Sequence, residues 1–437
     1  MSSRTIKNRW KHRNKILLAY SDKSGSVYDY PNLNSAFMVG RHPVRVFHED
    51  LIKIPKGSVL FSLPERHPVF YNPKKNDFDS LTHSIDGQEI WAVSSFLSSG
   101  YLRTHLPAYQ KKKNAPILPL WAYTGVVIID GEFFVPALRV DVDPRSDPEQ
   151  HQNDYKLGIE IKNLQKKYPN NRLIKQLSFC SKEYRCLCAR NFFLSRFEAP
   201  LPTSQYCNAR CIGCLSYQKN SGFSESQIRL NFKPTPDEIS QLILHHIENV
   251  DASIVSFGQG CEGEPLLRGK DLAKAITIVR KKTCKGTINI NTNGSLPKMV
   301  KILIDSGLDS IRISLNSPTS KYYKRYFNPV NYIFDDVLRS IEISLEAGIF
   351  VSINLFFLPG FTDMESEVES LFSFFNKFPV NMIQTRNLNI DPEYYLDTIG
   401  YIESAPIGIK KLLNLIKKIF PSIKIGYYNP PKERMYS

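Results

Sequence analysis

Three cysteines fall within eight residues of the chain, Cys207, Cys211 and Cys214, in a Cys-x3-Cys-x2-Cys pattern. Thiolates are soft ligands, and such ligands select zinc, Cu(I) or iron–sulfur clusters. Three ligands leave one coordination position open, which distinguishes a catalytic site from a closed structural one. A structural zinc site completed by a distant residue such as Cys261 is the alternative. The triad by itself predicts a metal site and leaves cluster and zinc both open.

Four later segments carry a further pattern: Gly-Cys-Glu-Gly-Glu-Pro-Leu-Leu at 260–267, Thr-Asn-Gly at 292–294, Arg-Ile-Ser-Leu-Asn at 312–316 and Pro-Gly-Phe-Thr-Asp at 359–363. Together with the cysteine loop at 207–214, these segments resemble the radical S-adenosylmethionine (SAM) superfamily in order, spacing and strand placement. Within the superfamily, the chain resembles uncharacterised members related to pyruvate formate-lyase-activating and molybdenum-cofactor-biosynthesis proteins. It departs from the usual pattern at Gly213, where an aromatic residue is common.

The resemblance implies a site and a reaction. Cys207, Cys211 and Cys214 would each bind one iron of a [4Fe–4S] cluster, and SAM would chelate the fourth iron. The cluster would reductively cleave SAM to a 5′-deoxyadenosyl radical, which abstracts hydrogen from a substrate that the sequence does not identify. The residues implied in SAM binding lie at or near the carboxyl ends of the predicted strands: Glu262, Gly263, Glu264, Thr292, Asn293, Ser314, Asn316 and Asn354.

The end of the sixth predicted strand is unusually polar, with Gln384, Arg386 and Asn387 close together. These side chains are candidates for binding the substrate, since the planar fork of an arginine suits a carboxylate or a phosphate. A strand at a solvent-exposed edge of the sheet would also explain the alternating polar residues. Both interpretations stay open.

Another group of cysteines, Cys180, Cys186 and Cys188, precedes the triad. Their spacing is compatible with a second cluster or a zinc ion, but buried free cysteine is a common packing residue. Outside the enzyme class, the alternative for the whole chain is a zinc- or iron–sulfur-stabilised module that binds nucleic acid. Within the enzyme class, RNA modification and the activation of a glycyl-radical protein are the alternatives.

The elements that position these residues are short, apolar, β-rich segments separated by helical patterns. A cap, a first-turn proline and a capping-box acid occur at Thr235-Pro236-Asp237-Glu238, and Gly348 ends a later helical pattern. The stretches between the predicted strands are long enough for crossover connections. Such connections join parallel strands. With a first strand before Cys207, the pattern predicts an α/β fold with a partial (β/α)6 barrel. The predicted strands are Ile254–Phe257, Thr287–Asn291, Ser310–Leu315, Phe350–Phe357 and Asn381–Leu388.

The first part of the chain consists of short apolar or alternating segments separated by turn residues. It is predicted to be a smaller, β-rich domain. Asp130-Gly131 lies between two β-type runs, which is a strong hairpin signal. The predicted division is a basic tail at 1–15, the β-rich domain at 16–142, a linker and bridging segment at 143–200, the radical SAM partial barrel at 201–392 and a C-terminal extension at 393–437.

The 437 residues carry a net charge of +15, from 57 Lys and Arg against 42 Asp and Glu. A basic surface suits RNA or an acidic electron donor such as flavodoxin or ferredoxin, and the charge does not separate the two. No apolar run approaches the roughly 20 residues of a membrane-spanning helix. Eight cysteines without a secretory signal favour reduced thiols or metal ligands in a cytoplasmic protein.

Overall fold

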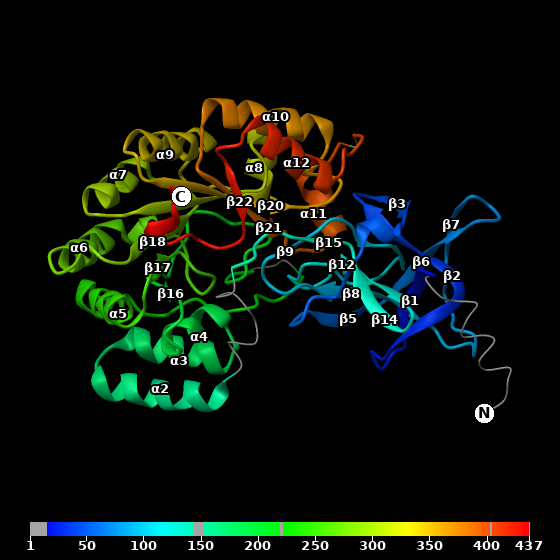
Figure 1. Ribbon diagram of the computed structural model, residues 1–437, viewed down its shortest axis with the longest axis horizontal. Coiled ribbons are helices and arrows are strands. Elements are labelled where there is room, and N and C mark those ends of the chain that lie inside the picture. The colour runs from blue at the N-terminus through cyan, green and yellow to red at the C-terminus, as the bar shows by residue number, and fades with distance from the viewer. Residues whose placement is uncertain (1–14, 144–152, 219–221, 403, 437) are drawn as a thin grey trace. The chain divides into compact units, whose positions relative to one another are not determined.

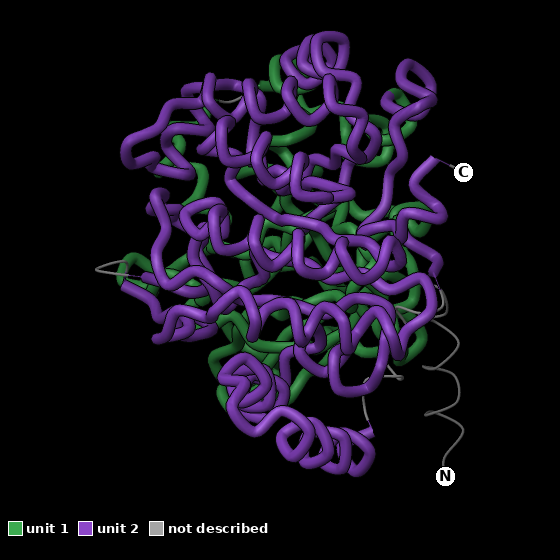
Figure 2. Tube along the Cα trace, turned by 90° about the vertical axis from the view of Figure 1, so that its left-hand side faces the viewer, with its two compact units in different colours: residues 1–140, 357–368, 387–415 green, residues 141–356, 369–386, 416–437 purple. Residues whose placement is uncertain are grey.

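The computed structural model describes residues 15–143, 153–218, 222–402 and 404–436. The chain divides into two compact units, each built from several stretches of sequence (Figure 2). Unit 1 holds residues 1–140, 357–368 and 387–415, and unit 2 holds residues 141–356, 369–386 and 416–437. The N-terminal β-rich region therefore forms one unit with two segments that follow strands of the predicted barrel.

The N-terminal part of unit 1 consists of antiparallel strands (Figure 1). Most of them join one branched sheet whose longest path is β11-β6-β2-β1-β13-β14-β4, and β9 pairs with β15 separately. The strands are β1 Leu17–Ser21, β2 Val27–Val39, β3 His42–Arg45, β4 Ile52–Lys53, β5 Val59–Leu63, β6 Arg66–Asn72, β7 Asp77–Ser80, β8 Trp91–Phe96, β9 Tyr101–Arg103, β10 Leu106–Pro107, β11 Tyr109–Lys111, β12 Thr124–Gly125, β13 Val127–Ile129, β14 Glu132–Val135 and β15 Ala137–Arg139, with a 3-10 turn η1 at His48–Asp50.

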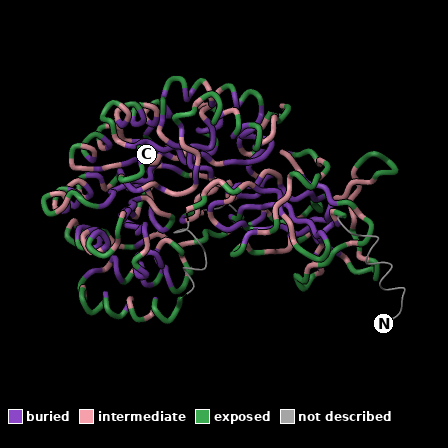
Figure 3. Tube along the Cα trace, in the orientation of Figure 1, coloured by how far each residue is buried: buried purple, intermediate pink, exposed green. Residues whose placement is uncertain are grey.

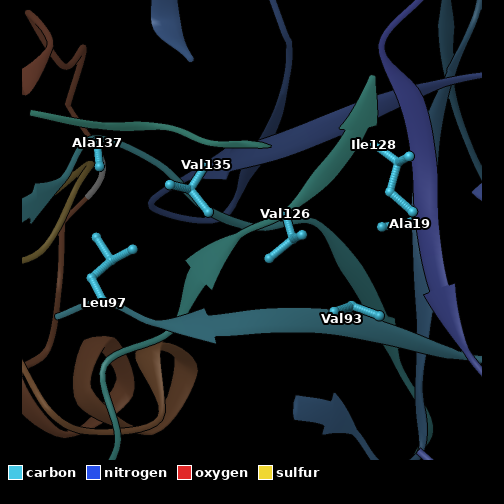
Figure 4. Close-up of a cluster of buried hydrophobic side chains, with 7 residues drawn as sticks. All are labelled: Ala19, Val93, Leu97, Val126, Ile128, Val135 and Ala137. Carbon is cyan, nitrogen blue, oxygen red and sulfur yellow. The ribbon is translucent and has the colours of Figure 1, made fainter. Parts of the chain in front are cut away.

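The predicted hairpin at Asp130-Gly131 is confirmed, because Ile129 pairs with Glu132 and leaves a two-residue turn. Both turn residues have positive φ, as this tight turn requires. Apolar side chains from β1, β8, β13 and β14 and from the segments beside them meet in a buried core (Figure 4). That core contains Ala19, Val93, Leu97, Val126, Ile128, Val135 and Ala137.

The segment after strand β21 joins unit 1 through buried polar contacts. Asp391 caps the helix α11, Pro392–Ile399, by accepting hydrogen bonds from the backbone N–H groups of its first turn. The same carboxylate pairs with Arg66 at 3.1 Å, and both side chains are almost fully buried. A buried ion pair of this kind fixes the geometry of the groups that carry it.

Unit 2 is built on a parallel sheet in the order β16-β17-β18-β19-β20-β21-β22. The predicted α/β fold with a partial barrel is confirmed, and three predicted strands have the bounds that the sequence indicated. The last strand, β22, comes from the C-terminal extension and pairs with β21. The strands are β16 Glu198–Leu201, β17 Ile254–Phe257, β18 Thr287–Thr292, β19 Ser310–Leu315, β20 Phe350–Phe357, β21 Met382–Asn387 and β22 Lys424–Gly426.

Helices α5, α6, α7 and α9 lie along one side of this sheet (Figure 1). Helix α5 begins with the predicted capping box of Thr235 and Glu238, and α9 is followed by Gly348 at positive φ. The strands are mostly buried, whereas these helices have exposed outer faces (Figure 3). The helices of the sheet region are α5 Pro236–Asn249, α6 Gly269–Arg280, α7 Pro297–Asp305, α8 Ser320–Phe327, α9 Phe334–Glu346, α10 Glu365–Lys377 and α12 Ile409–Ile419, with 3-10 turns η4 Pro265–Arg268 and η5 Lys432–Arg434.

The predicted bridging segment is largely helical. It contains α2 Asp154–Lys167, α3 Arg172–Lys182 and α4 Leu187–Phe193, which pack on one another before β16 begins. The basic tail up to residue 14 and the linker at 144–152 lie outside the described residues. Within the part of the chain that the structure describes, no helix is long and apolar enough to cross a membrane.

Candidate active site

The cysteine loop follows β16 and is held against the segment after α8. The backbone N–H of Arg210 donates to the Phe327 carbonyl at 2.9 Å, and that of Ile212 donates to the Tyr326 carbonyl at 3.0 Å. In return, the N–H of Val330 donates to the Asn208 carbonyl at 2.8 Å. These three bonds fix the backbone between and beside the cysteines, so the thiols are held by a preformed loop.

The three thiols are half-buried and close enough to influence one another. Burial raises the pKa of Cys207 to about 12, and the charge of Glu264 adds to that effect. Burial also raises the pKa of Cys211 well above its usual value, with further contributions from Cys214 and Cys207. A set of thiols that resists ionisation on its own becomes a set of thiolates when metal cations supply the opposite charge. The donor set therefore fits an iron–sulfur cluster.

The alternative of a structural zinc site needs Cys261 beside the triad. Cys261 instead lies beside Cys180, close enough for a hydrogen bond. Among the residues that the structure describes, no group of three or more His, Cys, Asp or Glu side chains is arranged to hold one metal ion. A cluster at Cys207, Cys211 and Cys214 is the site that the resemblance implies.

The loop after β17 is joined to the cysteine loop by backbone hydrogen bonds. Gly263 N–H donates to the Ser204 carbonyl at 2.7 Å, and Glu264 N–H donates to the Tyr206 carbonyl at 2.8 Å. A Cβ atom on Gly263 would lie 1.9 Å from the Tyr206 oxygen, so only glycine permits this approach. This loop contains the segment at 260–267 that the sequence implicates in SAM binding, and we call it the SAM loop. It thereby lies next to Cys207.

The carboxylate of Glu262 organises this loop from inside. Its Oε2 accepts from the backbone N–H groups of Thr203 at 2.8 Å and Ser204 at 2.9 Å, and its Oε1 accepts from Gly258 and Gln259. Burial raises the pKa of Glu262 to about 7, although these hydrogen bonds act in the opposite direction. The side chain is fully engaged within the protein, and the Glu262 carbonyl accepts from the Ser216 hydroxyl at 3.1 Å. The next carbonyl, that of Gly263, is therefore the candidate acceptor of this segment for a ligand.

Glu264 and the end of β18 form a second fixed unit. The Glu264 carboxylate accepts from the Thr292 hydroxyl and from the backbone N–H of Asn293 at 2.8 Å. The Asn293 amide in turn donates to the side chain of Asn208 at 2.9 Å, within the cysteine loop. Burial raises the pKa of Glu264 to about 7. Glu264, Thr292 and Asn293 therefore brace the cysteine loop.

The next two strands bring Ser314 and Asn354 together, because these residues are paired in register. The Asn354 amide donates to the Ser314 hydroxyl at 3.3 Å, and its Oδ1 atom is buried without a hydrogen-bond partner among the described residues. Asn316 instead donates to the Tyr322 carbonyl at 3.2 Å. Of the residues implied in SAM binding, Asn354 has the clearest unused polar atom.

The three predicted substrate residues separate into two groups. Gln384 and Arg386 lie on one face of β21, and their side chains contact each other at 3.3 Å. The amide of Asn387 is instead hydrogen-bonded within unit 1, where it accepts from the Arg103 backbone N–H and donates to the Tyr101 carbonyl, both at 2.9 Å. The structure thus brings together only Gln384 and Arg386.

Two arginines near these sites were not among the predicted ligands. Arg229 donates from Nη2 to the Cys214 sulfur at 3.5 Å and from Nε to the Ser216 hydroxyl at 3.0 Å. Arg312 lies on β19 and donates to the Gln384 side chain at 2.8 Å. Its position between Ser310 and Ser314, with apolar residues alternating, is a signal that the sequence does contain. Arg229 lies in a segment without periodicity and carries no such signal.

Four of the other five cysteines form two neighbouring pairs, and the fifth, Cys284, is exposed. Cys180 lies beside Cys261, and Cys186 lies beside Cys188, close enough for each pair to interact through hydrogen bonding. The interaction with Cys188 lowers the pKa of Cys186 to about 7. All eight cysteines of the chain are free thiols.

Comparison with known protein families finds a match in the second half of the chain. Residues 201–374 match the family described as the radical SAM superfamily. These residues form a radical SAM domain. The resemblance carried by the cysteine loop and the downstream motifs is confirmed. Enzymes with this domain use a [4Fe–4S] cluster and SAM, and the match favours an enzyme over a module that binds nucleic acid.

The radical SAM domain is shared with curated relatives over only part of their length. The chain is 32% identical to the GTP 3′,8-cyclase of Lactiplantibacillus plantarum over 126 residues, which are 29% of this chain and 35% of that protein. It is 28% identical to the GTP 3′,8-cyclase of Clostridium acetobutylicum over 205 residues, which are 46% of this chain and 54% of that protein. The match therefore spans about half or less of these relatives.

Among solved structures, the chain is similar to the FeFe-hydrogenase maturase HydG from Carboxydothermus hydrogenoformans, at 15% identity and a TM-score of 0.37. That match covers 63% of this chain and 71% of HydG. Streptococcus suis SuiB gives 15% identity and a TM-score of 0.37, covering 59% of this chain and 54% of SuiB.

Proposed function

We propose that this chain is a SAM-dependent radical enzyme whose [4Fe–4S] cluster is held by Cys207, Cys211 and Cys214. Together, the reduced cluster and SAM supply a 5′-deoxyadenosyl radical that abstracts hydrogen from a substrate. The single observation that carries the assignment is the pair of backbone hydrogen bonds at Gly263 and Glu264, which join the SAM loop to the cysteine loop. Both loops follow the carboxyl ends of parallel strands, where ligands bind in such folds.

Different residues of the chain bind different groups of SAM. The backbone carbonyl of Gly263 suits the ammonium group of the methionine moiety, because the carboxylate and the carbonyl of Glu262 are already engaged. Ser314 and Asn354 offer a hydroxyl and an unused amide oxygen on the adjacent strands. Thr292, Asn293 and Glu264 act as positioning residues for the cysteine loop. Asn316 holds the turn after β19.

The same proposal extends to the surroundings of the reaction. An acidic one-electron donor such as flavodoxin or ferredoxin is supported by the net charge of +15. A reducing compartment such as the cytoplasm is supported by the eight free cysteines. RNA modification and glycyl-radical activation stay alternatives for the substrate, and the names of the relatives add a purine nucleotide to the compounds to test.

Anaerobic reconstitution with iron and sulfide tests the proposal. We expect about four irons per chain, an electron paramagnetic resonance signal of the reduced cluster that changes on adding SAM, and formation of 5′-deoxyadenosine with dithionite. Cys214→Ser should abolish all three. Cys284→Ser is the matched control, because Cys284 is exposed and lies outside the site. A wild-type protein that holds a cluster but never forms 5′-deoxyadenosine would contradict the assignment.

A further inference from the structure

The face of the parallel sheet that does not pack against the helices is polar along its central strands. On β19, Ile311, Ile313 and Leu315 are fully buried, whereas Arg312 and Ser314 between them are only half-buried. On β21, Arg386 is also half-buried, two residues after the fully buried Gln384. Because side chains alternate along a strand, Arg312, Ser314, Gln384 and Arg386 share the side of the sheet away from the helices.

Arg312 and Arg386 approach each other across this face. Arg312 Nη1 donates to Gln384 Oε1 at 2.8 Å, and Arg386 Nη2 donates to the same oxygen at 3.3 Å. Gln384 is held in this orientation because its amide donates to Asn429 at 2.6 Å. The Arg386 guanidinium lies 3.7 Å from the centre of the Tyr427 ring, which fixes its plane. Two cations therefore share one neutral acceptor.

Within the described residues, no carboxylate forms a salt bridge with either guanidinium. Both groups donate to Gln384 instead, and Arg312 Nε is buried without a hydrogen-bond partner there. The Glu198 carboxylate interacts electrostatically with Arg312. Its Oε1 atom, however, already accepts hydrogen bonds from Ser256 at 2.6 Å and from Asn429 at 2.8 Å. Burial and the charge of Arg386 lower the pKa of Arg312 to about 10. Two positive charges against one carboxylate leave room for one more anion.

We propose that Arg312 and Arg386 bind an anionic oxygen group of the substrate, a carboxylate or a phosphate. This inference rests on the proposed function, since the ligand is the molecule from which hydrogen is abstracted. The guanidinium forks offer paired N–H donors, which match the oxygens of either group. Buried cations held together without anions are costly, and a bound anion removes that cost.

The register of the strands also orients the substrate. Arg312 precedes Ser314 by two residues on the same face, so it lies roughly 7 Å farther from the carboxyl end of β19. The cysteine loop and the SAM loop lie at those carboxyl ends. A substrate held by its anionic end at Arg312 and Arg386 therefore extends toward the cluster with its other end. The hydrogen that is abstracted belongs to a carbon distant from the anionic group by a few bonds.

Titration calorimetry on the cluster-loaded protein with SAM tests the inference, with inorganic phosphate and malonate as separate probes. We expect at least one of them to bind, and Arg386→Gln to weaken that binding by about 10- to 100-fold, as for a lost charge-assisted hydrogen bond. Phosphate binding alone indicates a phosphorylated substrate, and malonate binding alone indicates a carboxylate. Arg312→Gln should weaken binding in the same way. If Arg312→Gln does not fold, anion binding is measured with Arg312→Lys, which keeps the charge but loses the planar fork.

The matched control is Arg339→Gln, which removes one positive charge from the exposed face of α9. Binding that is absent from the wild-type protein, or equal in Arg386→Gln and Arg339→Gln, overturns the inference. Formation of 5′-deoxyadenosine by the wild-type protein is measured in the same preparation. Its presence without anion binding disproves the anion site alone, and its absence disproves the proposed function itself.

Discussion

Two arginines of unit 1, Arg66 and Arg103, have different surroundings from two arginines of unit 2, Arg312 and Arg386. In unit 1, Arg66 is paired with Asp391, and Arg103 donates from both Nη atoms to backbone carbonyl oxygens. Both side chains are fully buried. In unit 2, Arg312 and Arg386 are half-buried and share the side chain of one glutamine. A buried Nε without a partner occurs in Arg66, Arg103 and Arg312 alike, so the difference lies in the Nη atoms.

This difference gives a criterion that distinguishes structural arginines from arginines that bind a ligand. A guanidinium whose forked donors are all used by the protein stabilises the fold and has nothing to offer a ligand. A guanidinium whose donors are shared or unused has a binding capacity that the chain does not fill. By this criterion, Arg66 and Arg103 hold segments of unit 1 together, whereas Arg312 and Arg386 of unit 2 have binding capacity left for another molecule.

The largest effect is expected at the edge of unit 2 that holds the two loops. Gly263→Ala places a Cβ atom 1.9 Å from the Tyr206 carbonyl and must separate the SAM loop from the cysteine loop. A displacement on the order of 1 Å at a reacting centre costs about 100-fold in rate. We expect formation of 5′-deoxyadenosine to fall by that factor. Wild-type rates in Gly263→Ala would show that the loop contact is not needed.

Gly158→Ala is the control for this substitution. Gly158 lies within helix α2, and an added Cβ meets no atom within 4 Å. Replacing an unconstrained helical glycine by alanine stabilises a protein by about 0.5–1 kcal/mol. We expect this variant to keep its rate and to unfold at a slightly higher denaturant concentration.

Asp391→Asn in unit 1 is expected to have the largest effect on stability. It leaves Arg66 buried without its anionic partner and should cost about 3–5 kcal/mol. The tryptophans of the chain, Trp10, Trp91 and Trp121, all precede residue 141, so urea titration followed by their emission reports on unit 1. Arg386→Gln in unit 2 should leave that transition unchanged. Equal effects of the two variants would contradict the distinction between the units.

A pH-dependent effect is expected from Glu262 in unit 2. Its pKa is raised to about 7 in the folded protein, mainly by burial, from 4.5 for an exposed glutamate. The folded state therefore binds more protons between these values, and stability falls as the pH rises from about 4.5 through about 7, by about 3 kcal/mol. Urea titrations of the apoprotein, followed by helical circular dichroism, should show this slope in the wild type and in Glu346→Gln. Glu262→Gln should lose the part that Glu262 contributes and keep the part from Glu264, whose pKa burial also raises to about 7.

The strands of unit 2 were predictable because their signals are local. Apolar or alternating runs bounded by turn residues give β17, β19 and β20 their bounds. The three-residue strand β22 is too short to leave such a pattern, and only its pairing with β21 defines it. The cysteine loop and the residues that follow each strand were also predictable, since the carboxyl ends of parallel strands meet at one edge.

The parts of the site that the sequence did not predict depend on side-chain direction and on long-range contacts. Gln384 and Arg386 are two residues apart and share a face, whereas Asn387 is one residue further and faces the other way. The period of a strand thus separates Asn387 from the substrate candidates, and the Tyr101 and Arg103 backbone groups that bind its amide come from a distant part of the sequence. Arg229 reaches Cys214 only through the folded loop, so no spacing in the sequence indicates that contact.

Arg229 supplies the smallest predicted effect, and it extends the comparison to a third kind of arginine. It donates to the Cys214 sulfur at 3.5 Å and to the Ser216 hydroxyl at 3.0 Å, while its guanidinium lies 5.1 Å from the centre of the Tyr217 ring. An N–H donor to a cluster thiolate stabilises the reduced state, which carries more negative charge. Arg229→Met should therefore lower the reduction potential of the cluster by an amount on the order of tens of millivolts.

A redox titration monitored by electron paramagnetic resonance measures this shift. Arg229→Lys keeps the positive charge but loses the planar fork, so it should recover part of the shift and leave the rest. If the effect were only structural, both variants would lose iron and neither would change the potential of the clusters that remain. A full recovery by lysine would show that charge alone matters. An unchanged potential in both variants would place Arg229 with the structural arginines of unit 1.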